Sequence, residues 1–559
     1  MELGGIFVSL VFMGVCLARK AWPLLALWVL LAVGLCWVMA GWWLTLLLLG
    51  GLGYYGRVRW AHRGAQDTVG RWNRAAVKHH GLAGRWALLW TSSSWAMRRH
   101  MRVLRPSFAA LSRIERWRVP VRQYAVPLTQ VGWLWIWATV EEMVCQYGRP
   151  RRGKSGQLVH WVVDAPGTAI VASTKPDLKR LTEGLRRKVG PTYCFNPTNI
   201  GGVPTTIGFD PLVECTNAER AGERAVDLIS GGAERADGDG RRWDKQAERV
   251  MTGLLHAAAL GGHTMTDVLS WASDPDGARR EVLALLRTSP TAYAFVPAAE
   301  QFFSTNSRTR SSVTFTIMPA LAWLTSADAM ATTQGATQFD VKRLLADKAT
   351  VYLLAEADSN MGPLLSALAG YIAREARRIA MGCPGERLDP GLRLVLDEAA
   401  NICPVPLDRW SSYFGSAGIQ IFATFQSRAQ VIKRWGMAGA RDIQNNTGAT
   451  ILHAYGSDTD DLAHFVTLSG HRTDEHGHRV PVLSLTHLTN LPRGTTVVWP
   501  PETPVTIGRM KPGWRRRDVR AQLAEERVDA AAIVAQMEDL LIEEVAAGAE
   551  PAGAAGGGR

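Results

Sequence analysis

The first 56 residues form the most apolar part of the chain. Residues 4–18 carry no charge, Arg19 and Lys20 interrupt the run, and residues 21–56 are again uncharged and rich in Leu, Val and Trp. As one helix, the second run would be about 50 Å long at 1.5 Å per residue, whereas the hydrocarbon core of a membrane is about 30 Å thick. The pattern therefore predicts a membrane anchor of two or three transmembrane segments over residues 1–56.

Arginines dominate the segment that follows, residues 57–130. Between Arg57 and Arg122 the acidic residues are Asp67 and Glu115 alone. Positive charge favours the cytoplasmic side of a membrane, so the pattern predicts that the chain after the apolar runs is cytoplasmic. A basic segment next to a membrane fits lipid head groups or direct contact with DNA, and both interpretations stay open.

Short apolar runs alternate with helical patterns in two later stretches of the chain. Residues 143–147 and 168–173 have the pattern of strands on either side of a helical run at 156–163, which is typical of a βαβ unit in a parallel sheet. Strand patterns resume at residues 349–355, 394–396, 419–424, 450–454 and 495–499. We therefore predict an α/β domain built from residues 131–215 and 346–515.

A different pattern occupies the residues between these stretches. From about residue 216 to 345 apolar side chains recur at helical spacing, as in residues 243–258, and strand patterns are few. This predicts an all-α insertion domain at 216–345. Residues 516–559 begin with an acidic amphipathic pattern and end in a Gly/Ala run, which predicts a helix followed by a disordered tail.

Composition narrows the class of partner. The 559 residues are 47% hydrophobic and 20% charged, which fits a globular protein and argues against extensive disorder. The net charge of +13 indicates an anionic partner, either nucleic acid or anionic lipid.

One segment matches the motif G-x-x-x-x-G-K-[ST] in full and lies between a strand pattern and a helix pattern. Its glycines allow backbone N–H groups to surround phosphate oxygens at the positive end of a helix. We expect Lys154 to reach the β and γ phosphates of ATP, and the Ser155 hydroxyl to bind Mg²⁺. The predicted nucleotide-binding loop consists of Gly148, Arg149, Pro150, Arg151, Arg152, Gly153, Lys154 and Ser155.

A phosphate loop needs a carboxylate at the end of a buried strand, and the apolar run at 394–396 ends at Asp397 and Glu398. We predict that Asp397 holds Mg²⁺ through water and that Glu398 orients or deprotonates the attacking water. Taken alone, such an acidic pair is more often a helix N-cap.

Three further side chains are candidates for the predicted site. Gln426 follows the apolar run at 419–424, where its amide is placed to sense the γ-phosphate, although a solvated glutamine at a strand end is the competing interpretation. Together with Lys154 and Glu398 it completes the predicted catalytic set. Arg308 and Arg310 of the helical insertion are candidates for an arginine finger acting on a neighbouring subunit, but nothing in the sequence singles them out.

Four segments together resemble the TraG/TraD family of type IV secretion system coupling proteins, particularly its actinobacterial branch. The segments are residues 148–155 (GRPRRGKS), 164–177 (DAPGTAIVASTKPD), 396–401 (LDEAAN) and 424–427 (TFQS). The resemblance runs from about residue 133 to 510. It implies a RecA-like P-loop motor domain with an inserted all-α domain, preceded by N-terminal transmembrane helices. Ala399 stands where many members have Phe, and the last forty or so residues have no family counterpart.

The resemblance also implies a function. It implies a hexameric ATPase that transfers relaxase-bound, single-stranded DNA through a type IV secretion channel in conjugation. The implied partners are DNA without sequence preference, the relaxase or relaxosome, components of the channel and the membrane. The implied location is the bacterial inner membrane, multi-pass, with the ATPase domain in the cytoplasm.

Three other interpretations stay open. An FtsK-like translocase of double-stranded DNA would share the motor and the hexamer, but the sequence after Trp514 leaves no room for its winged-helix domain. A receptor for the relaxosome would bind without hydrolysis, and DNA-stimulated ATP hydrolysis would exclude it. A motor for protein export would move polypeptide instead of DNA.

Overall fold

The computed structural model describes residues 47, 49–54, 81–232, 240–290, 295–333, 340–456, 458–474 and 476–525. The chain forms two compact units, residues 1–72 and 73–559, and every element named below belongs to the second. Most of the predicted C-terminal tail lies outside the described residues, as do most of residues 1–56.

The N-terminal apolar runs predict transmembrane helices and a multi-pass location in the inner membrane. Among the described residues, however, no helix is both long and apolar enough to cross a bilayer. The predicted multi-pass location is wrong on this finding. Hydropathy counts apolar side chains, whereas a span also requires about 20 consecutive apolar residues in one helix. Of the two runs, the structure describes only residues 47 and 49–54.

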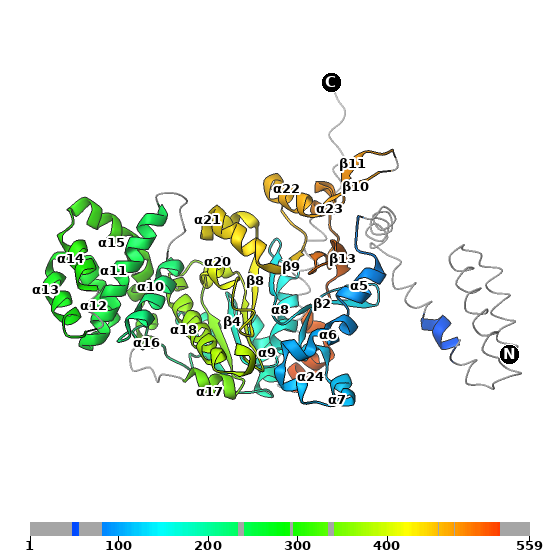
Figure 1. Ribbon diagram of the computed structural model, residues 1–559, viewed down its shortest axis with the longest axis horizontal. Coiled ribbons are helices and arrows are strands. Elements are labelled where there is room, and N and C mark those ends of the chain that lie inside the picture. Colours follow the sequence, from blue (N-terminus) through cyan, green and yellow to red (C-terminus); the bar gives the residue numbers. More distant parts are fainter. Residues whose placement is uncertain are drawn as a thin grey trace, which may run out of the picture. The chain divides into compact units, whose positions relative to one another are not determined.

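An eleven-stranded mixed sheet organises the second unit (Figure 1). Its parallel part has seven neighbouring strands, in the order β9 (Thr447–Leu452), β3 (Met143–Tyr147), β8 (Ile419–Phe425), β7 (Leu392–Leu396), β4 (Ala169–Ser173), β6 (Thr350–Leu354) and β5 (Thr192–Phe195). Four antiparallel strands extend it beyond β9, in the order β12 (Thr495–Trp499), β13 (Thr506–Arg509), β1 (Ala125–Val131) and β2 (Leu134–Thr139). A separate hairpin consists of β10 (His471–Thr473) and β11 (Arg479–Pro481).

Burial explains the sequence pattern of the central strands. Every residue of β3, β4, β6, β7 and β8 is buried. Strands of a parallel sheet that are covered on both faces have nearly continuous apolar runs instead of alternating ones. Apolar residues therefore dominate these five strands, although Gln146 of β3, Arg393 of β7 and Gln420 of β8 interrupt the runs.

Helices in the connections between parallel strands cover the sheet: α8 (Lys154–Val163), α9 (Asp177–Arg187), α18 (Gly362–Met381), α19 (Ala399–Ile402), α20 (Leu407–Trp410) and α21 (Arg428–Asn445). Trp161 of α8 stacks on Phe422 of β8, with ring centroids 4.2 Å apart, and its Nε1 donates to the Pro127 carbonyl at 3.0 Å. The buried Arg393 of β7 donates to the Trp161 carbonyl at 2.8 Å. These contacts hold α8, the helix after the phosphate loop, against β8 and against β7, which ends at the predicted acids.

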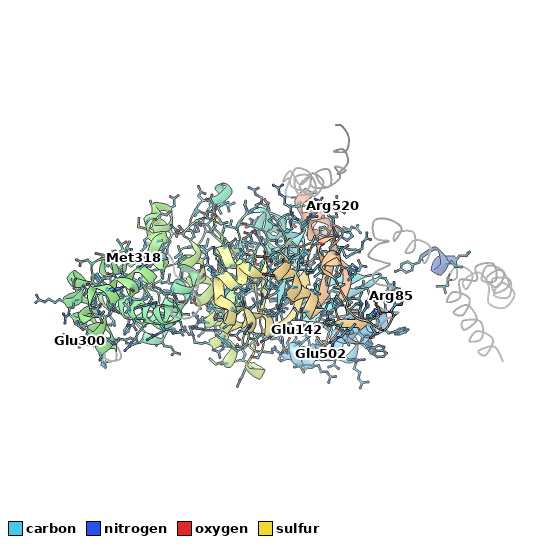
Figure 2. All side chains as sticks on the ribbon, turned by 90° about the horizontal axis from the view of Figure 1, so that it is seen from above. Arg85, Glu142, Glu300, Met318, Glu502 and Arg520 are labelled. Atoms are coloured by element: carbon cyan, nitrogen blue, oxygen red, sulfur yellow. The ribbon has the colours of Figure 1, made fainter. Side chains whose placement is uncertain are left out.

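Within its described residues, the stretch between β5 and β6 is helical: α10 (Ala218–Gly232), α11 (Gly240–Gly261), α12 (Met265–Ser273), α13 (Pro275–Leu286), α14 (Val296–Ser304), α15 (Ser307–Leu321), α16 (Ala327–Thr333) and α17 (Val341–Ala346). Figure 2 shows Glu300 of α14 and Met318 of α15 within this group of helices, well away from Arg85. An ion pair between Arg374 of α18 and the buried Asp227 of α10 ties the group to the sheet helices. The predicted boundaries of the all-α insertion domain, residues 216 and 345, remain predictions.

The remaining helices lie before β1 and after β9. They are α5 (Arg85–Thr91), α6 (Ser94–Leu104), α7 (Arg113–Arg118), α22 (Thr459–Leu468), α23 (Leu485–Thr489) and α24 (Arg517–Glu525). Because parallel strands end at the same edge of a sheet, the carboxyl ends of β3, β4, β7 and β8 lie together, and that edge holds the candidate site.

Candidate nucleotide-binding site

The phosphate loop connects β3 to α8 by a backbone that glycine makes possible. Gly148 N–H donates to the Phe425 carbonyl at 3.2 Å, which ties the start of the loop to β8. Gly153 precedes α8 with φ of +93°, in a region that L-residues with a side chain rarely adopt. The helix therefore begins directly at Lys154, as the predicted motif requires.

Lys154 is folded into this loop. The residue is 7% exposed, and its Nζ donates to the carbonyls of Gly148 and, at 3.0 Å, Arg149. Burial lowers the pKa of the ammonium, while Asp397 and Glu398 oppose that change. The structure thus brings the predicted lysine and the two predicted acids into one electrostatic group.

Replacing Gly153 with alanine is expected to lower the free energy of unfolding by about 1 to 3 kcal/mol and to weaken nucleotide binding, because of the positive φ. The added methyl group would also overlap Cε of Met510. Gly222→Ala is the matched control, since its methyl group would lie 3.8 Å from Thr252 in ordinary contact within helix α10. Urea denaturation and titration with a fluorescent ATP analogue measure both effects. Equal stability and binding in the two variants would contradict this expectation.

Asp397 and the phosphate loop line the same pocket, which has a volume of about 210 Å³. The backbone N–H of Asp397 donates to the Ala172 carbonyl at 2.9 Å, and its Oδ2 accepts from the Ser173 hydroxyl at 3.5 Å. Burial, with Glu398 next to it, raises the pKa of the carboxyl to about 6. The pocket is lined by Pro150, Arg151, Gly153, Lys154, Ser155, Val159, Ser173, Thr174, Lys175, Asp177, Leu178, Leu181, Asp397, Glu398 and Trp514.

The donor set of this pocket fits a magnesium nucleotide. A hard cation prefers oxygen ligands, and the Ser155 hydroxyl and the Asp397 carboxylate line the same pocket as the Lys154 ammonium. A cation there would offset the cost of burying the Asp397 charge. Sequence reasoning gave no role to eight of the lining residues, among them Lys175 and Trp514. Lys175 belongs to the quoted segment 164–177 and was given no role, while nothing in the local sequence marks Trp514.

Asp397→Asn is expected to stabilise the nucleotide-free protein in magnesium-free buffer at pH 8. Folding raises the pKa of this carboxyl from 3.8 to about 6, so between these values the native state keeps a proton that the unfolded chain has released. The stability it contributes is therefore present below pH 3.8 and lost as the pH rises through about 6. Above that pH, burying the ionised group costs about 2 to 3 kcal/mol, which asparagine avoids.

Urea denaturation at pH 5 and pH 8 tests this expectation, with the exposed Asp328→Asn as control. The gain in stability of Asp397→Asn over the original chain should be larger at pH 8. If Asp397→Asn lost stability at pH 8, or changed the free energy of unfolding equally at both pH values, burial of the ionised Asp397 carboxylate would not carry this cost.

Glu398 lies in the left-handed region of the backbone, with φ of 50° and ψ of 49°. It occupies the N-cap position of α19, but its side chain makes no capping hydrogen bond. Instead, its Oε1 accepts from Nε2 of Gln426 at 3.1 Å. The structure therefore joins Glu398 and Gln426, which the sequence analysis singled out separately. The Glu398 side chain does not cap the helix, which was the competing interpretation of the acidic pair.

The two arginine-finger candidates lie elsewhere, on α15. Arg310 donates to Asp276 at 2.7 Å and to the Phe303 carbonyl at 2.9 Å, and Arg308 is exposed. Neither lines the pocket of its own chain.

A second and larger cavity, of about 1140 Å³, adjoins the phosphate loop at Arg152 and Gly153. Trp135 and His160 contribute to its wall. Eight basic side chains line it, from parts of the chain far apart in sequence: Arg122, Arg152, Arg493, Arg509, Lys511, Arg515, Arg516 and Arg517. Such a cavity favours an anionic ligand.

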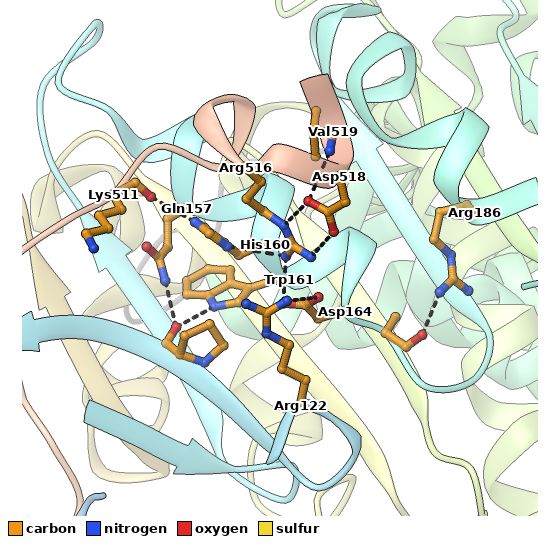
Figure 3. Close-up of polar contacts among 12 residues, drawn as sticks. Arg122, Gln157, His160, Trp161, Asp164, Arg186, Lys511, Arg516, Asp518 and Val519 are labelled. Atoms are coloured by element: carbon orange, nitrogen blue, oxygen red, sulfur yellow. Dashed lines mark hydrogen bonds and ion pairs between the residues drawn. The ribbon is translucent and has the colours of Figure 1, made fainter. Parts of the chain in front are cut away.

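Figure 3 shows how one wall of this cavity is held on α8. Arg516 donates to Asp164 at 2.7 Å and to Asp518 at 2.6 Å, and Arg122 reaches Asp164 at 3.4 Å. His160 bonds through Nε2 to the Lys511 carbonyl at 2.8 Å, and burial lowers the pKa of its ring. The segment before α24 is thus fixed to the helix that begins at Lys154.

A motif G-x-x-x-x-G-K-S between a buried parallel strand and a helix, with an acidic strand end beside it, defines the P-loop class of α/β proteins. Within that class the chain is similar to type IV coupling proteins of the TraG/TraD type. Residues 391–481 match the family model described as the TraM recognition site of TraD and TraG. No curated protein matches the chain in sequence.

Solved structures of the plasmid coupling protein TrwB share the fold. TrwB in complex with ADP and Mg²⁺ has a TM-score of 0.52 at 16% identity, over 67% of this chain and 86% of that one. TrwB with the non-hydrolysable ATP analogue ADPNP has a TM-score of 0.52 at 16% identity, over 66% and 86%. The complex with the GTP analogue GDPNP has a TM-score of 0.51 at 16% identity, over 66% and 86%. The predicted resemblance and the α/β class are confirmed.

Proposed function

We propose that this protein is an ATPase that drives DNA transfer through a type IV secretion channel in conjugation. The observation that carries the proposal is the collection of Lys154, Ser155, Asp397 and Glu398 around one pocket at the edge of a parallel sheet. Support comes from the likeness to TrwB, a coupling protein solved with ADP and Mg²⁺ and with an ATP analogue. We propose ATP and Mg²⁺ as the ligands of this chain too.

Each residue of the pocket has a distinct part in the proposed mechanism. The Lys154 ammonium exchanges its loop carbonyls for the β and γ phosphates, and the Ser155 hydroxyl and, through water, Asp397 would hold Mg²⁺. When bound, the cation would supply positive charge against the charge that develops on the phosphates. Glu398 orients the attacking water and accepts its proton, and Gln426, bonded to Glu398 at 3.1 Å, responds to the γ-phosphate.

The cationic cavity extends this site. Gly153 lines both the pocket and the cavity, so the two adjoin at the phosphate loop. The basic lining complements phosphate oxygens, which carry the negative charge of a nucleotide, and not the uncharged nucleoside. We assign the cavity to phosphate groups next to the loop.

Further parts of the proposal concern organisation and partners. Residues 131–215 and 346–515 would form the motor domain, residues 216–345 the all-α insertion, and six copies the working ring. Residues 391–481, which match the TraM recognition site of TraD and TraG, would contact a relaxosome protein. DNA, gripped through its backbone without base readout, is the proposed cargo.

The test is ATP hydrolysis by the full chain, alone and with single-stranded or duplex DNA. Turnover stimulated by single-stranded DNA supports the coupling-protein proposal. Stimulation by duplex DNA alone favours an FtsK-like translocase. A folded, ATP-binding protein without turnover under any of these conditions refutes the motor and leaves a relaxosome receptor.

A further inference from the structure

Asn401 ends the segment 396–401 and has no part in the proposed mechanism, yet it contacts the proposed base. Its Nδ2 donates to Oε2 of Glu398 at 3.3 Å, while Oε1 of the same carboxylate accepts from Gln426. Its own Oδ1 accepts from Nε2 of Gln430 at 2.8 Å. Gln430 in turn accepts, through Oε1, the backbone N–H of Gln426 at 3.0 Å. The four residues therefore form a closed ring of hydrogen bonds.

The donors and acceptors of this ring can be arranged in only one way. A backbone N–H can only donate, so Gln430 must turn its oxygen toward Gln426 and its NH₂ toward Asn401. Asn401 must then accept with Oδ1 and turn its own NH₂ toward Glu398. One main-chain donor thus fixes the orientation of two side-chain amides, and both oxygens of Glu398 receive a donor.

The ring also joins two elements of the sheet edge. Glu398 and Asn401 follow β7, whereas Gln426 follows β8 and Gln430 lies in the first turns of α21. Arg434, one turn further along α21, donates to the Ala400 carbonyl at 2.8 Å and supports the same junction. One donor from each of the two elements therefore holds the Glu398 carboxylate.

We propose that Asn401 and Gln430 are positioning residues that hold the Glu398 carboxylate at the angle required to orient the water that attacks the γ-phosphate. The proposal rests on the ATPase function proposed above. Neither residue lines the pocket, so each acts through Glu398 and not on the nucleotide. Gln430 has no hydrogen bond to Glu398 and reaches it through Asn401 on one side of the ring and through Gln426 on the other.

Two isosteric variants test the direction of the ring. Asn401→Asp removes the donor to Glu398 without a change of shape, and Gln430→Glu removes the donor to Asn401, two hydrogen bonds away from the carboxylate. Each is expected to lower kcat roughly 10- to 100-fold, since small misplacement of a reacting group has effects of this size. KM for ATP should change by less than about threefold, because the phosphate loop is untouched. Asn445→Asp, on the exposed end of α21, makes the same chemical change outside the ring and should leave both constants unchanged.

A double variant separates positioning from simple packing. If Gln430 acts on Glu398 through Asn401, Asn401→Ala with Gln430→Glu should lower kcat no further than Asn401→Ala alone, because Gln430→Glu keeps the acceptor for the Gln426 N–H and removes only the donor to Asn401. Independent packing roles would instead give multiplied losses. Binding of a fluorescent ATP analogue and the thermal midpoint establish that each variant is folded.

The outcomes also separate the two proposals. Suppose that the original chain hydrolyses ATP. If Gln430→Glu then has the same kcat as the original chain, or if its KM rises while its kcat is unchanged, the positioning role is refuted and the ATPase function stands. If the original chain has no turnover under any condition, the proposed function fails first and the relay fails with it. Lower kcat with constant KM in both isosteric variants supports the relay.

Discussion

Lys154→Ala is expected to abolish measurable ATP turnover, a loss on the order of 10³-fold or more, and to weaken nucleotide binding strongly. A preorganised cation in a site shielded from water stabilises developing charge on phosphate far better than a solvated one. Lys154 is 7% exposed and is held between the carbonyls of Gly148 and Arg149 at the start of α8. The measurement is phosphate release at saturating ATP, combined with titration of a fluorescent ATP analogue.

A matched control exists in the same pocket. Lys175 also lines it, but its side chain is exposed to solvent, so Lys175→Ala should lower turnover by a much smaller factor. Both variants should keep the thermal midpoint of the original chain within a few degrees. Comparable activity of Lys154→Ala and the original chain would mean that this pocket is not where ATP is hydrolysed.

The second large effect is expected for Glu398→Gln. Removing a positioned general base typically costs about 10² to 10⁴ in rate, and here ATP binding should persist because the loop and Asp397 are unchanged. The amide cannot accept a proton from water. It also offers one acceptor in place of two, so the donors of Gln426 and Asn401 can no longer both be satisfied. Single-turnover hydrolysis and analogue binding, measured side by side, separate the two steps.

Glu386→Gln is the control that isolates the role of position. Glu386 is also a glutamate in the left-handed region, with φ of 54°, but it is exposed and outside the pocket. Its variant should hydrolyse ATP at the original rate. If Glu398→Gln did the same, another residue would have to activate water and the assignment of Glu398 would be lost.

The parts of the site that the sequence predicted are those encoded locally. The phosphate loop is eight consecutive residues that run from the end of one strand into the first turn of one helix, and the Asp397–Glu398 pair directly follows an apolar strand. The placement of both therefore follows from short-range patterns. The α/β class follows from the same alternation. Their roles in ATP hydrolysis stay predictions.

Contacts between distant residues could not be predicted in the same way. Gln426 reaches Glu398 because β7 and β8 pair in parallel, with Leu396 opposite Ala423, and no local pattern specifies that pairing. The cationic cavity combines residues 122–160 with residues 493–521, which only the order of strands brings together. The sequence also does not predict the ion pair between Arg310 and Asp276, because that pair depends on how α13 and α15 pack.

The order of strands also has a consequence for synthesis on the ribosome. Of the first five strands, only β1 and β2 are neighbours, while β3 lies between β9 and β8, and β4 between β7 and β6. When β3, α8 and β4 emerge, the strands that flank them are still untranslated, and β6 follows β5 only after the helical stretch. The nascent chain must therefore carry unpaired apolar strand edges through most of its translation, the state in which aggregation competes with folding. We expect the yield of folded protein to depend on elongation rate and chaperone supply more than on the stability of the finished sheet.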